Sequence, residues 1–128
     1  MTESENGVSK GEGYAVANLS DLGDGPGFRK IRGPLGVTAF GINGIVLPPS
    51  YTTNLHHHER QEEVYIVIDG EIEMTLGGET RTLRAGGIAR VDAATVRSLR
   101  NTSPDAEATY VCVGGEGGYV GRDGVLDA

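Results

Sequence analysis

The sequence has one cysteine, no long apolar run and fewer basic than acidic residues, and each shortage excludes a structural feature or a kind of partner. Cys112 is the only cysteine among 128 residues, which excludes an intrachain disulfide. No stretch stays apolar over the roughly 20 residues that a membrane-spanning helix needs, and no signal peptide is recognisable. The 18 acidic residues outnumber the 11 basic ones, for a formal charge of −7, which argues against nucleic-acid and anionic-membrane partners. We therefore expect a cytoplasmic protein with neither kind of partner.

The pattern of glycines and apolar residues predicts an all-β domain. Glycine is 21 of the 128 residues and separates short apolar or alternating segments, while no window shows the 3.6-residue period of a helix. The polar residues 1–13 are predicted to be a mobile tail, and residues 14–128 a single domain. Strands are expected at 37–47, 64–68, 71–76, 79–83, 88–91, 96–101 and 108–113. The turn pairs Asp69-Gly70 and Gly77-Gly78 are predicted to close hairpins.

The expected strand at 64–68 reads VYIVI and has no polar face. A sheet with one face in water would alternate apolar and polar residues, so both faces of this strand are expected to be covered. The interior of the domain covers one face, and the other is left for a second sheet, an N-terminal strand or another subunit. Of these we favour another subunit and expect a homodimer.

The three histidines, His56, His57 and His58, are consecutive, and a carboxylate follows at Glu63. Side chains two apart on a strand share a face, so His56 and His58 can bind one ion while His57 points away. Glu63 joins them only if the chain bends within residues 59–62. Imidazole and carboxylate ligands predict a divalent metal such as Zn, Fe, Mn or Ni, with water or substrate in the open positions. The alternative to a metal site is that the three histidines lie in a solvated loop that precedes a strand.

These residues resemble the first motif of the cupin superfamily. The spacing His56-x-His58-x4-Glu63-x6-Gly70 matches that motif from its first histidine onward, and the resemblance extends over about residues 37–113. It implies a double-stranded β-helix, or jelly-roll barrel, that holds a metal through His56, His58 and Glu63. Members of this superfamily include enzymes of several classes and proteins that only bind ligands, so the fold alone does not select a function.

The segment from Gly86 to Asn101 is similar to the second cupin motif in its spacing, but Arg97 stands where the family has a histidine. Two further identities of that motif also differ. A guanidinium keeps its proton and cannot ligate a cation, so Arg97 has two alternative roles. It pairs with Glu63 and leaves a metal-free barrel, or it lies beside the metal and binds an anionic group of the substrate.

Two functions therefore remain open. One is a metal-dependent enzyme of dioxygenase, isomerase or lyase type, acting on a small anionic substrate that Arg97 and Tyr65 bind. The other is a metal-free, non-catalytic protein that binds or senses a small ligand, with Arg97 paired to Glu63. No catalytic residue is identified beyond the metal ligands. Cys112 is interpreted as a buried core thiol, because the sequence indicates no base near it.

Overall fold

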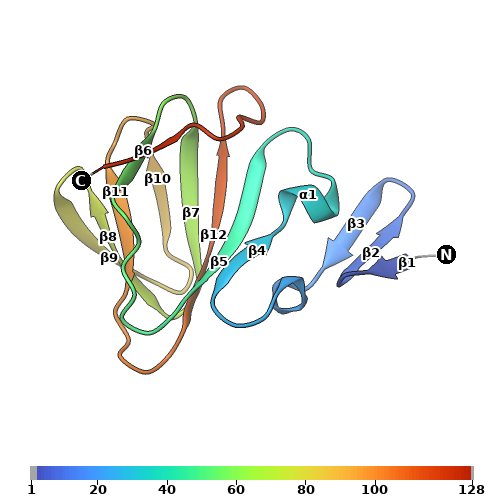
Figure 1. Ribbon diagram of the computed structural model, residues 1–128, viewed down its shortest axis with the longest axis horizontal. Coiled ribbons are helices and arrows are strands. Elements are labelled where there is room, and N and C mark those ends of the chain that lie inside the picture. Colours follow the sequence, from blue (N-terminus) through green and yellow to red (C-terminus); the bar gives the residue numbers. More distant parts are fainter. Residues whose placement is uncertain (1–2, 128) are drawn as a thin grey trace.

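Short antiparallel strands are the main secondary structure of the computed structural model, which describes residues 3–127 (Figure 1). In chain order the elements are β1 (Glu3–Glu5), β2 (Val8–Gly11), β3 (Tyr14–Ala17), the 3-10 turn η1 (Leu19–Leu22), β4 (Gly27–Lys30), α1 (Arg32–Leu35), β5 (Gly41–Leu47), β6 (His56–His58), β7 (Glu62–Asp69), β8 (Glu71–Leu76), β9 (Glu79–Arg84), β10 (Ile88–Val91), β11 (Arg97–Asn101), β12 (Ala108–Gly115) and β13 (Gly124–Leu126). They form a three-stranded sheet, β1-β2-β3, and two five-stranded sheets, β10-β7-β12-β5-β4 and β13-β6-β11-β8-β9. The predicted all-β class is confirmed. No helix among residues 3–127 is long and apolar enough to span a membrane.

The hydrophobic core lies between the two five-stranded sheets, because alternation along each strand turns one set of side chains inward. In β8, Ile72 and Met74 are fully buried, whereas Glu71 is exposed. The buried core residues are Leu47, Tyr65, Val67, Ile72, Met74, Val91, Leu99, Ala108 and Tyr110. Removing their apolar surface from water holds the two sheets face to face.

The two predicted hairpin turns have different outcomes. Gly77-Gly78 closes the hairpin between β8 and β9, with φ angles of 58° and 86° that suit glycine. Asp69-Gly70 does not close a hairpin, because β7 and β8 belong to different sheets. Both edges of β7 are already paired, with β10 and β12, so the chain turns at Gly70 and crosses to the other sheet.

The structure corrects the predicted mobile tail over residues 3–11, which form β1 and β2. Asn6 and Gly7 connect these strands with positive φ angles of 52° and 82°, the combination that a tight hairpin turn favours. Val8 is 3% exposed, so this sheet also buries an apolar side chain. Residues 1 and 2 of the predicted tail lie outside the described residues.

The second face of β7 is only partly covered within residues 3–127. Tyr65 and Val67 are buried on the inner face, whereas Val64 and Ile66 are half-buried and Ile68 is 51% exposed. The homodimer expected to cover this face stays a prediction.

Candidate metal centre

Three potential metal ligands from the two facing sheets converge on one point. His56 and His58 lie on β6, Glu63 lies on β7, and their donor atoms are all within 4.8 Å of one another. Donors bound to one metal ion are about 3–4 Å apart, so small side-chain rotations bring this set to bonding geometry. His57 faces the other way, and its Nδ1 lies 2.8 Å from Oδ2 of Asp127.

Glu63 reaches the histidines because the chain bends after His58. At the bend, the backbone N–H groups of Arg60 and Gln61 both donate to Oδ2 of Asp123, at 2.8 and 2.9 Å. This carboxylate replaces the strand pairing that residues 60 and 61 lack. The bend changes the parity of the strand, which brings Glu63 to the same side as His58.

Hydrogen bonds at Nδ1 fix the orientation of both inward-facing imidazoles. Nδ1 of His56 lies 3.3 Å from the carbonyl oxygen of Asn54, and Nδ1 of His58 lies 2.7 Å from Oδ1 of Asp123. A carbonyl or carboxylate oxygen only accepts, so these two contacts favour the tautomer with the proton on Nδ1, in which Nε2 is the ligand atom. Burial lowers the pKa of His56, which keeps that ring neutral and able to bind a cation.

The carboxylate of Glu63 is surrounded by hydrogen-bond donors. Its Oε1 accepts from the Tyr65 hydroxyl at 2.5 Å and from Arg97 at 3.2 Å, and its Oε2 accepts from the Cys112 thiol at 3.3 Å. Burial raises the pKa of Tyr65 and of Cys112 above their usual ranges, so both groups keep the proton that they donate. These three donors hold the side chain of Glu63 in one orientation.

In the Nδ1–H tautomer, the contact between Nε2 of His58 and Oε1 of Glu63, at 3.2 Å, brings two acceptors together. With the proton of a neutral ring on Nδ1, both atoms present lone pairs to each other. A cation between them, either a second proton or a metal ion, converts this repulsion into attraction. The donor set at this point of the structure therefore fits a divalent metal.

Arg97 is fully buried, and its guanidinium is engaged on three sides. Nε donates to the Tyr65 hydroxyl and one terminal nitrogen donates to Glu63, both at 3.2 Å. The other terminal nitrogen donates to the carbonyl oxygens of Ala93 and Thr95, at 3.0 and 2.7 Å. Of the two alternatives left open by the sequence, the pairing of Arg97 with Glu63 is the one that this geometry favours.

The C-terminal segment completes the site. Its strand β13 pairs with β6 over all three histidines, and Figure 1 shows this red segment running beside β6. Asp123, just before β13, accepts hydrogen bonds from His58, Arg60 and Gln61, and its side chain is 8% exposed. Burial alone raises the pKa of Asp123, but the hydrogen bonds from Gln61, His58 and Arg60 outweigh it and hold the pKa below its usual range.

A cavity of about 800 Å³ adjoins the three candidate ligands. Arg122 is the only lysine or arginine among its lining residues, and Arg97 is not one of them. Much of the wall is apolar or aromatic, from Phe28, Ile42, Ile45, Val46, Leu47, Tyr51, Tyr65, Tyr110 and Tyr119. The site therefore opens onto a space large enough for a small organic molecule.

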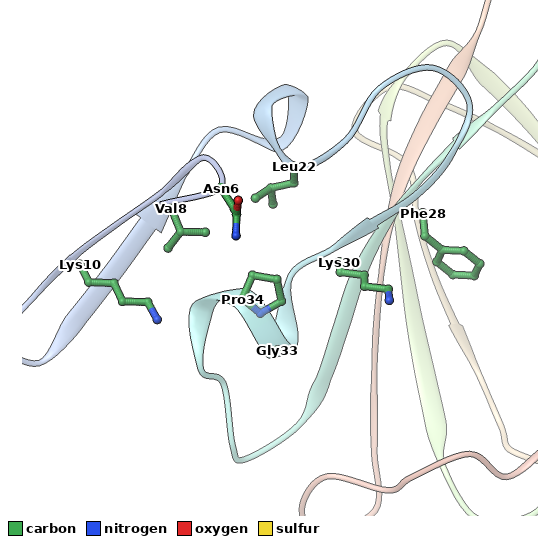
Figure 2. A pocket seen from close by; sticks show the side chains of 8 residues that line it. All are labelled: Asn6, Val8, Lys10, Leu22, Phe28, Lys30, Gly33 and Pro34. Atoms are coloured by element: carbon green, nitrogen blue, oxygen red, sulfur yellow. The ribbon is translucent and has the colours of Figure 1, made fainter. Parts of the chain in front are cut away.

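A second hollow, of about 590 Å³, lies between the N-terminal sheet and the β4–α1 region (Figure 2). Figure 2 shows Lys10 and Lys30 on either side of Pro34. The residues that line it include no histidine, cysteine or carboxylate, so this hollow has no metal ligands.

Comparison with known proteins identifies the family. Residues 45–114, which are more than half of the chain, match the family model described as Cupin domain. The chain belongs to the cupin superfamily. The matched region includes His56, His58, Glu63 and Arg97, but neither the N-terminal sheet nor Asp123. No curated protein matches this cupin.

Solved structures show the same cupin fold. A cupin protein from Bacteroides fragilis is 21% identical, with a TM-score of 0.68 over 91% of this chain and 98% of that one. A sugar phosphate isomerase of the cupin superfamily from Silicibacter pomeroyi is 24% identical, with a TM-score of 0.63 over 68% of this chain and 57% of that one. The cupin domain of an XRE family transcriptional regulator from Enterobacter cloacae is 27% identical, with a TM-score of 0.56 over 66% and 84%. These proteins differ in function, so the likeness confirms the predicted fold and not an activity.

The structure brings together the residues that the sequence suggested as ligands. His56, His58 and Glu63 form one cluster, and the predicted substrate-binding residues Arg97 and Tyr65 both contact Glu63. Their roles as metal-binding or substrate-binding residues stay predictions.

Sequence analysis missed two contributors to the site. Asp123 holds His58, although only the turn pair Asp123-Gly124 marks it in the sequence. Cys112 packs against the core as predicted, but it also lines the cavity and donates to Glu63, which the sequence did not indicate.

Proposed function

We propose that this cupin binds a divalent metal ion through His56, His58 and Glu63 and holds a small organic ligand beside it. The observation that supports this is the orientation of the imidazoles: each Nδ1 meets an acceptor, which favours the tautomer whose Nε2 lone pair is available to a metal. Metal-binding histidines typically have their second nitrogen fixed in this way. Two histidines and one carboxylate suit Fe(II), Zn, Mn or Ni and leave coordination positions open.

The surrounding residues have defined roles in this proposal. Tyr65 and Cys112 hold Glu63 in place by donating to its two oxygens. Arg97 offsets part of the negative charge of Glu63. The metal, when bound, supplies Lewis acidity that polarises an oxygen of the ligand.

The ligand that suits the cavity is a small anion with an apolar body. The walls are largely apolar, and Arg122 is the single fixed cation among the lining residues. Sequence analysis assigned the anion to Arg97, but that guanidinium is fully buried and already bonded to Glu63 and Tyr65. We therefore propose Arg122 as the anchor for the anionic group.

The second candidate function is a metal-free cupin that binds or senses a small ligand. One observation favours it: a guanidinium nitrogen of Arg97 lies 3.2 Å from Oε1 of Glu63, at the motif position where the family has a metal-binding histidine. A permanent positive charge at that distance disfavours a divalent cation. In this alternative the ion pair takes the place of the metal.

Metal analysis of the protein, purified without added metal and without a histidine tag, tests the proposal. We expect about one divalent ion per chain, and titration calorimetry with zinc should show a matching site. His56→Ala should weaken zinc binding at least about 100-fold, because it removes one of three ligands. His57→Ala is the matched control and should change affinity less than about threefold. A metal-free protein with no zinc site below millimolar concentration would support the second candidate instead.

We also propose that the protein is a homodimer. Ile68 on β7 and Ile88 on the neighbouring β10 are 51% and 66% exposed, which leaves apolar surface on the outer face of this sheet. Light scattering at micromolar concentration should give twice the chain mass, and a monomer mass would contradict the proposal.

A further inference from the structure

Two aspartates of the C-terminal segment each hold one histidine of β6. Oδ1 of Asp123 lies 2.7 Å from Nδ1 of His58, and Oδ2 of Asp127 lies 2.8 Å from Nδ1 of His57. The two contacts have the same chemistry, but His58 faces the site and His57 faces away from it. Comparing the two aspartates therefore separates two effects of a carboxylate: its effect on the metal site, and its effect on how the C-terminal segment packs against β6.

Asp123 is the more deeply placed of the two. Its side chain is 8% exposed, against 28% for Asp127. Its Oδ2 accepts the backbone N–H groups of Arg60 and Gln61, while its Oδ1 accepts from the Gln61 amide at 2.5 Å and from His58. Both oxygens are therefore engaged, Oδ2 by the bend that leads to β7 and Oδ1 by the imidazole and the Gln61 amide.

We propose that Asp123 is a positioning residue of the metal site. It keeps the proton of His58 on Nδ1 and so directs the lone pair of Nε2 toward Glu63, 3.2 Å away. It also fixes the bend that brings Glu63 to the histidines. The inference rests on the proposed metal binding, and it adds a residue outside the matched cupin region to the site.

This role requires a carboxylate and not only a side chain of that size. An asparagine has one accepting oxygen, whereas the two oxygens of Asp123 accept on separate sides. Asp123→Asn therefore has to give up either the backbone N–H groups at the bend or the proton of His58. In both cases a donor atom of the metal site loses its orientation.

Zinc binding to the full chain tests the proposal, with Asp127→Asn as the matched control. Asp123→Asn should lower zinc affinity about 10–100-fold, the usual effect of removing a carboxylate that orients a histidine ligand. Asp127→Asn removes the equivalent contact to His57 and should change affinity less than about threefold. Equal affinities for the parent and Asp123→Asn would overturn the proposal. An equal loss in both variants would also overturn it, because docking of the C-terminal segment would then explain the effect.

A second measurement needs no metal, and the spectrum of the parent alone can overturn the proposal. Two-bond proton–nitrogen NMR spectra of the zinc-free parent, labelled with 15N histidine, identify which ring nitrogen of His58 carries the proton. We expect Nδ1–H in the parent and a growing share of Nε2–H in Asp123→Asn. A parent in which the single proton of His58 sits on Nε2 would overturn the role of Asp123, even if the variant does not fold. If the parent binds no zinc, the proposed function fails while this spectrum still decides how Asp123 acts on His58.

Discussion

The two motif regions of this cupin face the same site but contribute differently to it. In the first, His56, His58 and Glu63 line the cavity and bring their potential ligand atoms to one point. In the second, Arg97 and Asn101 on β11 are fully buried, and their polar atoms bond within the protein. The first region is arranged to meet a ligand, whereas the second is arranged to hold the fold.

The register of the strands shows how this division arises. Arg97 pairs directly with His56 across β11 and β6, so its side chain starts from the position where the motif has a metal-binding histidine. The guanidinium is too long to stop there, and it reaches Glu63, Tyr65 and the loop carbonyls of the protein instead. At this position of β11 the chain therefore has a side chain that bonds within the protein, where the motif has a metal ligand.

The largest expected effect is on stability, in the second region. Asn101 is fully buried, and its amide nitrogen donates to the carbonyl oxygens of Leu47, Pro48 and Ala106, so Asn101→Ala removes the donor that these oxygens share. We expect a loss of about 3 kcal/mol of unfolding free energy, measured by urea denaturation. Zinc affinity of the folded fraction should stay unchanged. If Asn101→Ala also lowered zinc affinity, the second region would contribute to the metal site as well as to the fold.

In the first region, Glu63→Gln should abolish metal binding while the fold is retained. The amide loses the charge that attracts the ion, and we expect at least about a 100-fold weaker zinc affinity by calorimetry. Glu62→Gln is the matched control, because Glu62 is exposed and pairs with Arg90 outside the site. If both variants bind zinc as the parent does, Glu63 is not a ligand.

Arg97→His sharpens the comparison by giving the second region a ligand again. It removes the positive charge near Glu63 and adds an imidazole, so zinc affinity should rise about 10-fold or more. Arg97→Leu separates the two effects, because it removes the charge without adding a ligand. Equal or tighter binding by the parent would show that Arg97 does not occupy the fourth ligand position.

A smaller effect concerns pH. Burial lowers the pKa of His56 in the folded protein below the ordinary value of 6.5, so at lower pH the unfolded chain binds a proton that the folded chain does not. Stability should therefore fall as pH drops below 6.5 toward the folded pKa and then level off. His56→Asn should show a flatter profile in chelator-treated protein. Identical profiles for the two proteins would contradict the assignment.

Local patterns in the sequence predicted the strands well, because each depends on a few neighbouring residues. Alternation gave β8 its bounds, and Gly77-Gly78 marked its turn to β9. Asn6-Gly7 is also a strong hairpin signal, but it was overlooked because polar residues flank it. A hairpin can therefore form at such a turn even when the flanking strands do not alternate apolar and polar residues.

Long-range pairing was not predictable from the same patterns. The turn at Asp69-Gly70 looks like a hairpin turn, yet distant strands had already taken both edges of β7. The contact of Asp123 with His58 joins residues 65 positions apart, and no spacing rule covers it. Motif spacing found His56, His58 and Glu63 because they lie within eight consecutive residues.

The pairing of β13 with β6 has a consequence for the order of folding. The contacts of His58 with Asp123 and of His57 with Asp127 close loops of 65 and 70 residues, and loops of this length form late because their closure is entropically costly. Before that step, the rings of His57 and His58 lack the carboxylates that hold them. High-affinity metal binding would then require that β13 has already paired with β6. The metal would bind the folded chain and would not direct its folding.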